Sequence, residues 1–153
     1  MAGSYIVAGA RTPIGKMSGA LASFSAADLG SIAIKAALER AGVSPNEVDH
    51  VIMGQVLMAG QGQVPSRQAA VKAGIPMNVP AINVNKVCLS GLNSIYLADQ
   101  MIQAGDADIV IAGREALVEV HHARAFAHRR RDAEQQGIRR RHVADPVAEH
   151  IGI

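Results

Sequence analysis

The stretch Val84-Asn85-Lys86-Val87-Cys88-Leu89-Ser90-Gly91-Leu92-Asn93-Ser94 contains the only cysteine of the chain and decides how the fold is interpreted. It begins at the end of a strand-like run at residues 81–85 and extends into a strong helical pattern at residues 92–104, which Gly105 ends. Binding sites of open α/β sheets form where strands end and helices begin. Cys88 is therefore predicted at such a position.

The residue types around Cys88 suit a nucleophile, although a buried structural cysteine is the commoner role for a single Cys. A thiol at a helix N-terminus faces unpaired N–H groups and the positive end of the helix dipole. Both favour the thiolate, which is the nucleophilic form. The small residues Ser90 and Gly91 would let a ligand approach the backbone closely. Taken alone, these residues leave both roles of Cys88 open.

Outward from this stretch, strand-like and helix-like patterns alternate along the first 112 residues. Ser25 is the expected N-cap of one helix and Gly42 its expected C-terminal stop. The patterns predict strands at residues 5–8, 50–53, 81–85 and 109–112, and helices at residues 26–41, 66–73 and 92–104. Such alternation predicts an α/β fold with a mostly parallel sheet and helices on both faces.

Composition agrees with this fold and excludes several classes of protein. Hydrophobic residues make up 49% of the chain and aromatic residues 3%, so the core must be aliphatic. One cysteine excludes an internal disulfide and a cysteine-based zinc cluster. We expect a cytoplasmic protein, because no signal peptide and no apolar run of membrane-spanning length is visible. Glycine-rich loops are predicted at residues 9–15 and 54–62, and neither matches a phosphate-binding motif.

The stretch around Cys88 resembles the thiolase signature at the cysteine that carries the acyl group. Four other stretches resemble the same family in order and spacing, over residues 4–113 as a whole. They are Arg11-Thr12-Pro13-Ile14-Gly15, Val51-Ile52-Met53-Gly54-Gln55-Val56-Leu57, Gly62-Gln63-Val64-Pro65-Ser66-Arg67-Gln68-Ala69-Ala70 and Asp106-Ala107-Asp108-Ile109-Val110-Ile111-Ala112-Gly113. The resemblance implies a thiolase-like N-terminal half, in which the third of these stretches packs at a dimer interface.

The resemblance also implies a chemistry. Cys88 would hold an acyl group as a thioester, and its backbone N–H would form part of an oxyanion hole. The enzyme would cleave a 3-ketoacyl-CoA with free CoA or join two acyl-CoA molecules by Claisen condensation, within fatty acid metabolism. Coenzyme A carries the substrate, and no metal or redox cofactor is needed. A homo-oligomer is expected for the full-length family, without nucleic-acid or membrane partners. The sequence of residues 85–91 resembles the acetyl-CoA acetyltransferase branch more than the other thiolases. It also resembles thiolases more than the related β-ketoacyl synthases.

The pattern changes after Gly113, where the family continues with a second glycine and a Glu-Ser-Met run. Residues 114–153 hold eight Arg, no Lys, six acids and five of the six His, which supplies the whole net charge of +2. We therefore predict a thiolase-like domain at residues 1–113 and a divergent tail at residues 114–153, partly helical or disordered. Helix propensity favours a helix at residues 115–136 and no further buried strand. An out-of-frame translation after Gly113 is one hypothesis for the tail.

The family's C-terminal half supplies a histidine that activates the nucleophile and a second cysteine that acts as acid and base. This chain has no second cysteine, and the tail residues His121, His122 and His128 are interpreted as part of a solvated charged segment. Loss of each proton-transfer group costs on the order of 10²–10⁴-fold in rate. The chain is thus expected to be truncated and of doubtful activity by itself.

Two other functions remain open from the sequence. One is a non-catalytic thiolase-like fragment that only binds a partner. The other is nucleic-acid binding through the arginines at residues 129–131 and 139–141, which is disfavoured by the six interspersed acids. Among residues outside the tail, we expect Arg11, Lys86 and His50 to be structural or solvent-facing, whereas Asn85 and Ser90 could shape the site.

Overall fold

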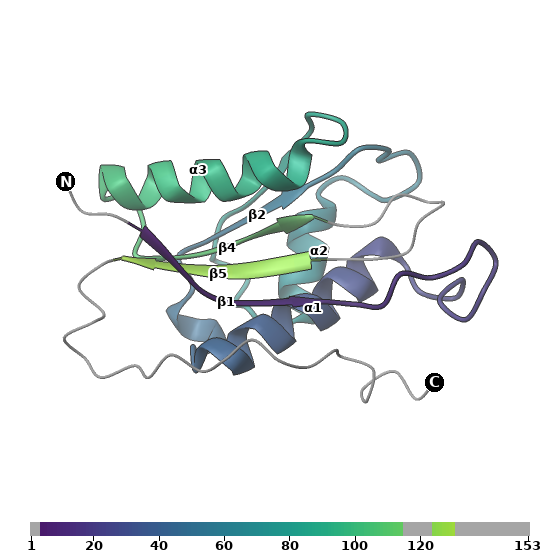
Figure 1. Cartoon of the computed structure of the whole chain (residues 1–153), viewed down its shortest axis with the longest axis horizontal. Coiled ribbons are helices and arrows are strands. Elements are labelled where there is room, and N and C mark those ends of the chain that lie inside the picture. The colour runs from purple at the N-terminus through teal and green to yellow at the C-terminus, as the bar shows by residue number, and fades with distance from the viewer. Residues whose placement is uncertain (1–3, 115–123, 131–153) are drawn as a thin grey trace.

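The computed structural model describes residues 4–114 and 124–130, which form one sheet flanked by helices (Figure 1). The elements are β1 (Ser4–Arg11), α1 (Ala26–Ala41), the short 3₁₀ helix η1 (Pro45–Glu47), β2 (His50–Gly54), α2 (Pro65–Lys72), β3 (Ala81–Val84), α3 (Ser90–Ala104), β4 (Ile109–Arg114) and β5 (Arg124–Arg130). All four predicted strands and all three predicted helices are present.

The sheet has the strand order β1-β5-β4-β2-β3. Strand β2 runs parallel to both β3 and β4, whereas β5 runs antiparallel to both β1 and β4. Strands β1, β4, β2 and β3 therefore share one direction. This confirms the predicted mostly parallel α/β fold, with α1 and α2 packed on one face and α3 on the other.

The helix predicted at residues 115–136 is wrong for residues 124–130, which form strand β5. In the structure, residues Arg124–Arg130 pair with β1 along one edge and with β4 along the other. A strand in this slot completes the backbone hydrogen bonds of both neighbours, and this long-range pairing outweighs a modest helix propensity. The predicted domain boundary after Gly113 falls inside β4, and the sheet continues beyond it in β5. The rest of the predicted tail lies outside the described residues.

Strand β1 is longer than predicted. A loop was expected at residues 9–15, but β1 continues to Arg11. Gly9, Ala10 and Arg11 pair with residues of β5, after an irregularity between Ile6 and Ala8. The ladder hydrogen bonds outweigh the weak strand propensity of glycine and alanine.

Helix α1 begins where its sequence predicts. The Ser25 side chain accepts a hydrogen bond from the Asp28 N–H at 3.1 Å, and the Asp28 carboxylate accepts one from the Ser25 N–H at 3.0 Å. This reciprocal capping box satisfies two otherwise unpaired donors. Gly42 ends the helix with φ of 64°, a left-handed conformation that glycine adopts without steric cost.

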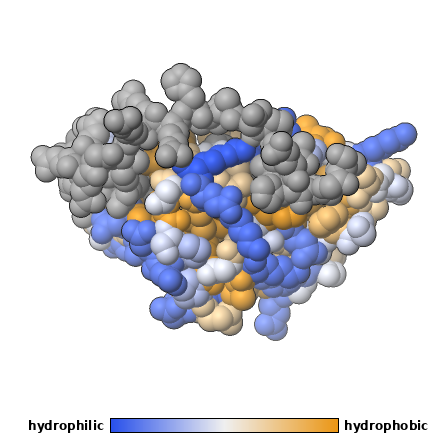
Figure 2. Space-filling view, turned by 90° about the horizontal axis from the view of Figure 1, so that it is seen from below, coloured by the Kyte–Doolittle hydropathy of each residue, from blue (hydrophilic) through white to orange (hydrophobic). Residues whose placement is uncertain are grey.

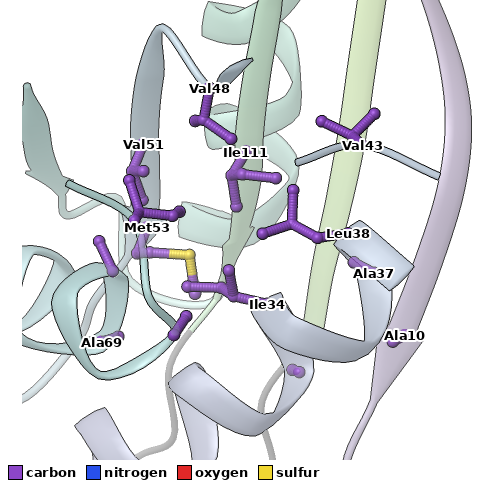
Figure 3. Close-up of a cluster of buried hydrophobic side chains, with 14 of the residues drawn as sticks. Ala10, Ile34, Ala37, Leu38, Val43, Val48, Val51, Met53, Ala69 and Ile111 are labelled. Atoms are coloured by element: carbon purple, nitrogen blue, oxygen red, sulfur yellow. The ribbon is translucent and has the colours of Figure 1, made fainter. Parts of the chain in front are cut away.

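Two aliphatic clusters cover the two faces of the sheet, because alternate residues of each strand point to opposite faces. Val51, Met53 and Ile111 pack against α1 and α2, as Figure 3 shows for Ile34 and Leu38 of α1. Ile52 and Val110 instead pack against α3. Their burial on both faces is typical of parallel sheets and accounts for the continuous apolar runs in the sequence.

An exposed ion pair joins the two helices on one face of the sheet. Lys72 at the end of α2 pairs with Asp28 at the start of α1. The hydrogen bond from Lys72, together with that from Ser25, lowers the pKa of Asp28 from 3.8 to about 2. Figure 2 views the molecule from the side of α1, where hydrophilic residues are interspersed with smaller apolar areas.

We expect Lys72→Ala to lower the free energy of unfolding by about 0.2–1 kcal/mol at pH 7, because both partners are more than one-third exposed and solvent screens the pair. The pKa of Asp28 is lower in the folded protein, so its contribution is present above pH 3.8 and is lost as the pH falls toward 2. The free energies of unfolding of the wild-type and Lys72→Ala proteins, measured with urea, should therefore converge as the pH falls from 3.8 toward 2. Lys35→Ala, on an exposed position of α1, is the control. A difference between Lys72→Ala and wild type that persists at pH 2 would contradict the pairing.

Candidate active site

The loop that carries Cys88 lies at the edge of the sheet where the parallel strands end. It joins β3, which ends at Val84, to α3, which begins at Ser90. Helix α3 thus begins two residues after Cys88, closer than the predicted start at residue 92. The Cys88 side chain is exposed. The expected placement of the cysteine between a strand end and a helix start is confirmed.

The loop has an unusual backbone at Val87. This residue has φ of 51°, in the left-handed region that a β-branched side chain rarely adopts. Conformations of this kind cost on the order of 1–3 kcal/mol and persist only when surrounding contacts hold them. Val87 immediately precedes Cys88, so the contacts that hold it also determine the direction of the cysteine backbone.

Two side chains supply those contacts. The Asn85 side-chain amide donates to the Val56 carbonyl at 2.9 Å, and its oxygen accepts from the Val87 N–H at 3.1 Å. The Ser90 hydroxyl accepts from the Lys86 N–H at 2.8 Å and lies 2.6 Å from the Val87 carbonyl and 2.8 Å from the Gln55 carbonyl. Both side chains therefore connect the loop at residues 85–89, the cysteine loop, to the segment that follows β2.

The backbone N–H groups around Cys88 have different partners. Those of Leu89 and Ser90 donate to the Lys86 and Val87 carbonyls, each at 3.1 Å. Those of Lys86 and Val87 donate to the Ser90 and Asn85 side chains.

The small residues near Cys88 take part in close internal packing. Ser90 is fully buried, and a Cβ atom on Gly54 would lie 2.6–2.8 Å from the Ser90 and Gly91 backbone and the Ser90 side chain. A Cβ atom on Gly91 would meet the Arg114 Cβ at 3.1 Å. The end of β2 and the start of α3 are thus in direct backbone contact. The sequence signals for Gly54 were its place in the family-like stretch at residues 51–57 and at the start of the glycine-rich segment at residues 54–62.

The remaining candidates lie apart from Cys88 or show structural roles. Arg11 is exposed, and its guanidinium donates to the neighbouring Thr12 carbonyl at 3.2 Å. Lys86 is exposed in the loop. His50 begins β2 at the end opposite Gly54, and burial is the main cause that lowers its pKa below 6.5. The placements of Arg11 and Lys86 agree with the structural roles expected for them. His50 differs, because it is part-buried and its Nδ1 atom is buried without a hydrogen-bond partner among the described residues.

Several tail candidates cannot be placed near the site. His121 and His122 lie outside the described residues, as do the arginines at residues 131 and 139–141. His128 belongs to β5, which is described by its backbone pairing alone.

Neither a metal centre nor a membrane span is found in the described part of the chain. Among those residues, no three His, Cys, Asp or Glu side chains are grouped so as to hold a metal ion. No helix among them combines the length and the apolar character needed to cross a membrane.

The fold and the cysteine loop define a class of protein that comparison with known families identifies. The sequence model described as "Thiolase, N-terminal domain" matches residues 4–150, nearly the whole chain. The chain belongs to the thiolase family. This match extends well beyond Gly113, where the resemblance of the individual motifs ends.

Similar proteins are named acetyl-CoA acetyltransferase. The chain is 58% identical over 123 residues to a probable acetyl-CoA acetyltransferase of Mycobacterium leprae, covering 80% of the chain and 31% of that protein. It is 61% identical over 108 residues to the acetyl-CoA acetyltransferase of Cupriavidus necator, covering 71% and 28%. A probable acetyl-CoA acetyltransferase of Escherichia coli is 58% identical over the same coverage. The chain thus spans about three-tenths of the length of these relatives.

Proposed function

We propose that this chain is the part of an acyl-CoA acetyltransferase that carries the nucleophile, and that Cys88 holds the acyl group as a thioester. The observation that carries the proposal is an exposed cysteine, two residues before a helix, in a loop held by side-chain hydrogen bonds at the carboxyl edge of the sheet. Membership of the thiolase family and relatives named acetyl-CoA acetyltransferase support the reaction type.

In the proposed reaction, the Cys88 thiolate attacks the 3-keto carbon of a 3-ketoacyl-CoA. The bond between carbons 2 and 3 breaks, and its electron pair remains on carbon 2, which takes up a proton and leaves as acetyl-CoA. Free CoA then attacks the acyl-cysteine, which releases a shortened acyl-CoA and regenerates the thiol. Claisen condensation is the reverse sequence. The Cys88 N–H is the proposed donor to the thioester oxygen.

The substrate carrier in this proposal is coenzyme A. No redox cofactor is required, because thioester exchange and carbon–carbon bond cleavage transfer no electrons to an external acceptor, and the proposal includes no metal. The groups that move protons in the family belong to its C-terminal half, so this chain alone is expected to react slowly. The complete protein is proposed to be a homo-oligomer, as expected for the family.

Incubation of the chain with acetoacetyl-CoA, followed by intact-protein mass spectrometry, tests the proposal. We expect a mass gain of one acetyl group, which peptide mapping locates on Cys88 and which hydroxylamine removes. Prior alkylation of the thiol should prevent the gain. An unmodified protein after long incubation, or an acetyl group on another residue, would contradict the proposal.

A further inference from the structure

We infer that Ser90 and Asn85 are positioning residues for Cys88, which together hold the cysteine loop against the end of β2. The inference rests on the proposed function and deepens it, because it assigns a role in acyl transfer to two side chains that do not carry the acyl group.

Ser90 is built into the protein interior. It is fully buried, and its hydroxyl accepts from the Lys86 N–H at 2.8 Å. The same hydroxyl lies 2.8 Å from the Gln55 carbonyl, 35 residues away in the sequence, and 2.6 Å from the Val87 carbonyl. One hydroxyl proton serves these two acceptors, while the oxygen remains an acceptor for Lys86. Ser90 therefore joins both sides of the loop to the segment after β2.

Asn85 makes a second connection to the same segment. Its side chain donates to the Val56 carbonyl at 2.9 Å and accepts from the Val87 N–H at 3.1 Å. Gln55 and Val56 are adjacent, so the two connections attach the loop on either side of Cys88 to one short piece of backbone. The Gln55 N–H in turn donates to the Val84 carbonyl at 2.8 Å, which continues the pairing of β2 with β3.

The two connections act on the strained residue Val87. The Val87 N–H donates to the Asn85 side chain, and the Val87 carbonyl accepts from both the hydroxyl and the backbone N–H of Ser90. The two side chains thus help to hold the peptide groups on either side of Val87 while its φ is 51°. Without these bonds the residue would relax toward a negative φ, which would rotate the Val87–Cys88 peptide group. That rotation would redirect the Cys88 N–H and displace the thiol. Such misplacement of a reacting group costs on the order of 10²-fold in rate.

Ser94 is a matched control within the same helix. It is also fully buried, and its hydroxyl donates to the Gly113 carbonyl of β4 at 2.8 Å and to the Gly91 carbonyl at 2.7 Å. Ser94→Ala thus removes a buried hydroxyl that joins α3 to a strand end, without a bond to the cysteine loop. It reproduces the structural cost of Ser90→Ala without its effect on Val87.

The test compares Ser90→Ala, Asn85→Ala and Ser94→Ala with the wild-type chain. The measured quantities are the maximal rate of Cys88 acetylation by acetoacetyl-CoA and the acetoacetyl-CoA concentration at half-maximal rate. We expect Ser90→Ala and Asn85→Ala to lower the maximal rate on the order of 10- to 100-fold with little change in that concentration. Ser94→Ala should lower thermal stability but keep the maximal rate. Asn85 is exposed, so Asn85→Ala provides the test if Ser90→Ala does not fold.

Hydrogen exchange of the loop separates this inference from the proposed function. Both loop variants should accelerate amide exchange of residues 86–90 while the second half of α3 stays protected. Equal rates of acetylation in all four proteins, or an equal loss in Ser94→Ala, would overturn the positioning role. If the wild-type chain forms no acetyl-cysteine, the proposed function fails, whereas unchanged loop exchange in both variants refutes the positioning role independently.

Discussion

The Cys88→Ala chain is expected to form no acetyl-enzyme with acetoacetyl-CoA, a complete loss relative to the wild-type chain. Thioester formation requires a sulfur nucleophile, and the chain has one cysteine. Cys88→Ser should also lack a stable adduct under the same conditions, because a hydroxyl without an activating base is a far weaker nucleophile than a thiolate.

Folding should be unaffected by this substitution. Cys88 is exposed, and substitutions at exposed sites change the free energy of unfolding by about 0.5 kcal/mol or less. Circular dichroism and urea unfolding check that the variant is folded, and Lys86→Ala is the control for a change in the same exposed loop. Acetylation of the Cys88→Ala chain at the wild-type rate would show that another residue accepts the acyl group.

Gly54→Ala is expected to lower the free energy of unfolding by about 1–3 kcal/mol and to slow acetylation of Cys88. The added Cβ would lie 2.6 Å from the Ser90 carbonyl carbon and 2.7 Å from the Gly91 nitrogen. Backbone atoms of a strand and a helix cannot rotate away, so β2 and α3 must move apart. This movement would stretch the bond from Ser90 to the Gln55 carbonyl and release the cysteine loop.

Gly60→Ala is the control for Gly54→Ala. Its φ is +74° and a Cβ there meets no atom within 4 Å, so its cost comes from the backbone conformation alone, about 1–2 kcal/mol. Urea unfolding should therefore show destabilisation in both variants, whereas only Gly54→Ala should slow acetylation. Wild-type acetylation in a destabilised Gly54→Ala chain would disprove the link between the β2–α3 contact and Cys88.

The sequence by itself determined the elements whose signals lie within a few residues. Apolar periodicity, the N-cap residue Ser25 and the terminal glycine Gly42 specify α1, with bounds that agree with the structure. The motif around Cys88 placed the cysteine between a strand and a helix and identified the family, because the residues of that motif are contiguous.

Only the tertiary structure decided what depends on contacts between distant segments. Strand β5 occupies a slot between β1 and β4 that local propensity does not encode, and β1 extends to Arg11 because β5 pairs with it. Ser90 and Gly54, 36 residues apart, meet only when α3 packs on the sheet, so the buried role of Ser90 was invisible in a motif that indicated ligand access. The physical reason is the range of the forces: capping and periodicity act within a few residues of the chain, whereas strand pairing and backbone contact are determined by the assembled sheet.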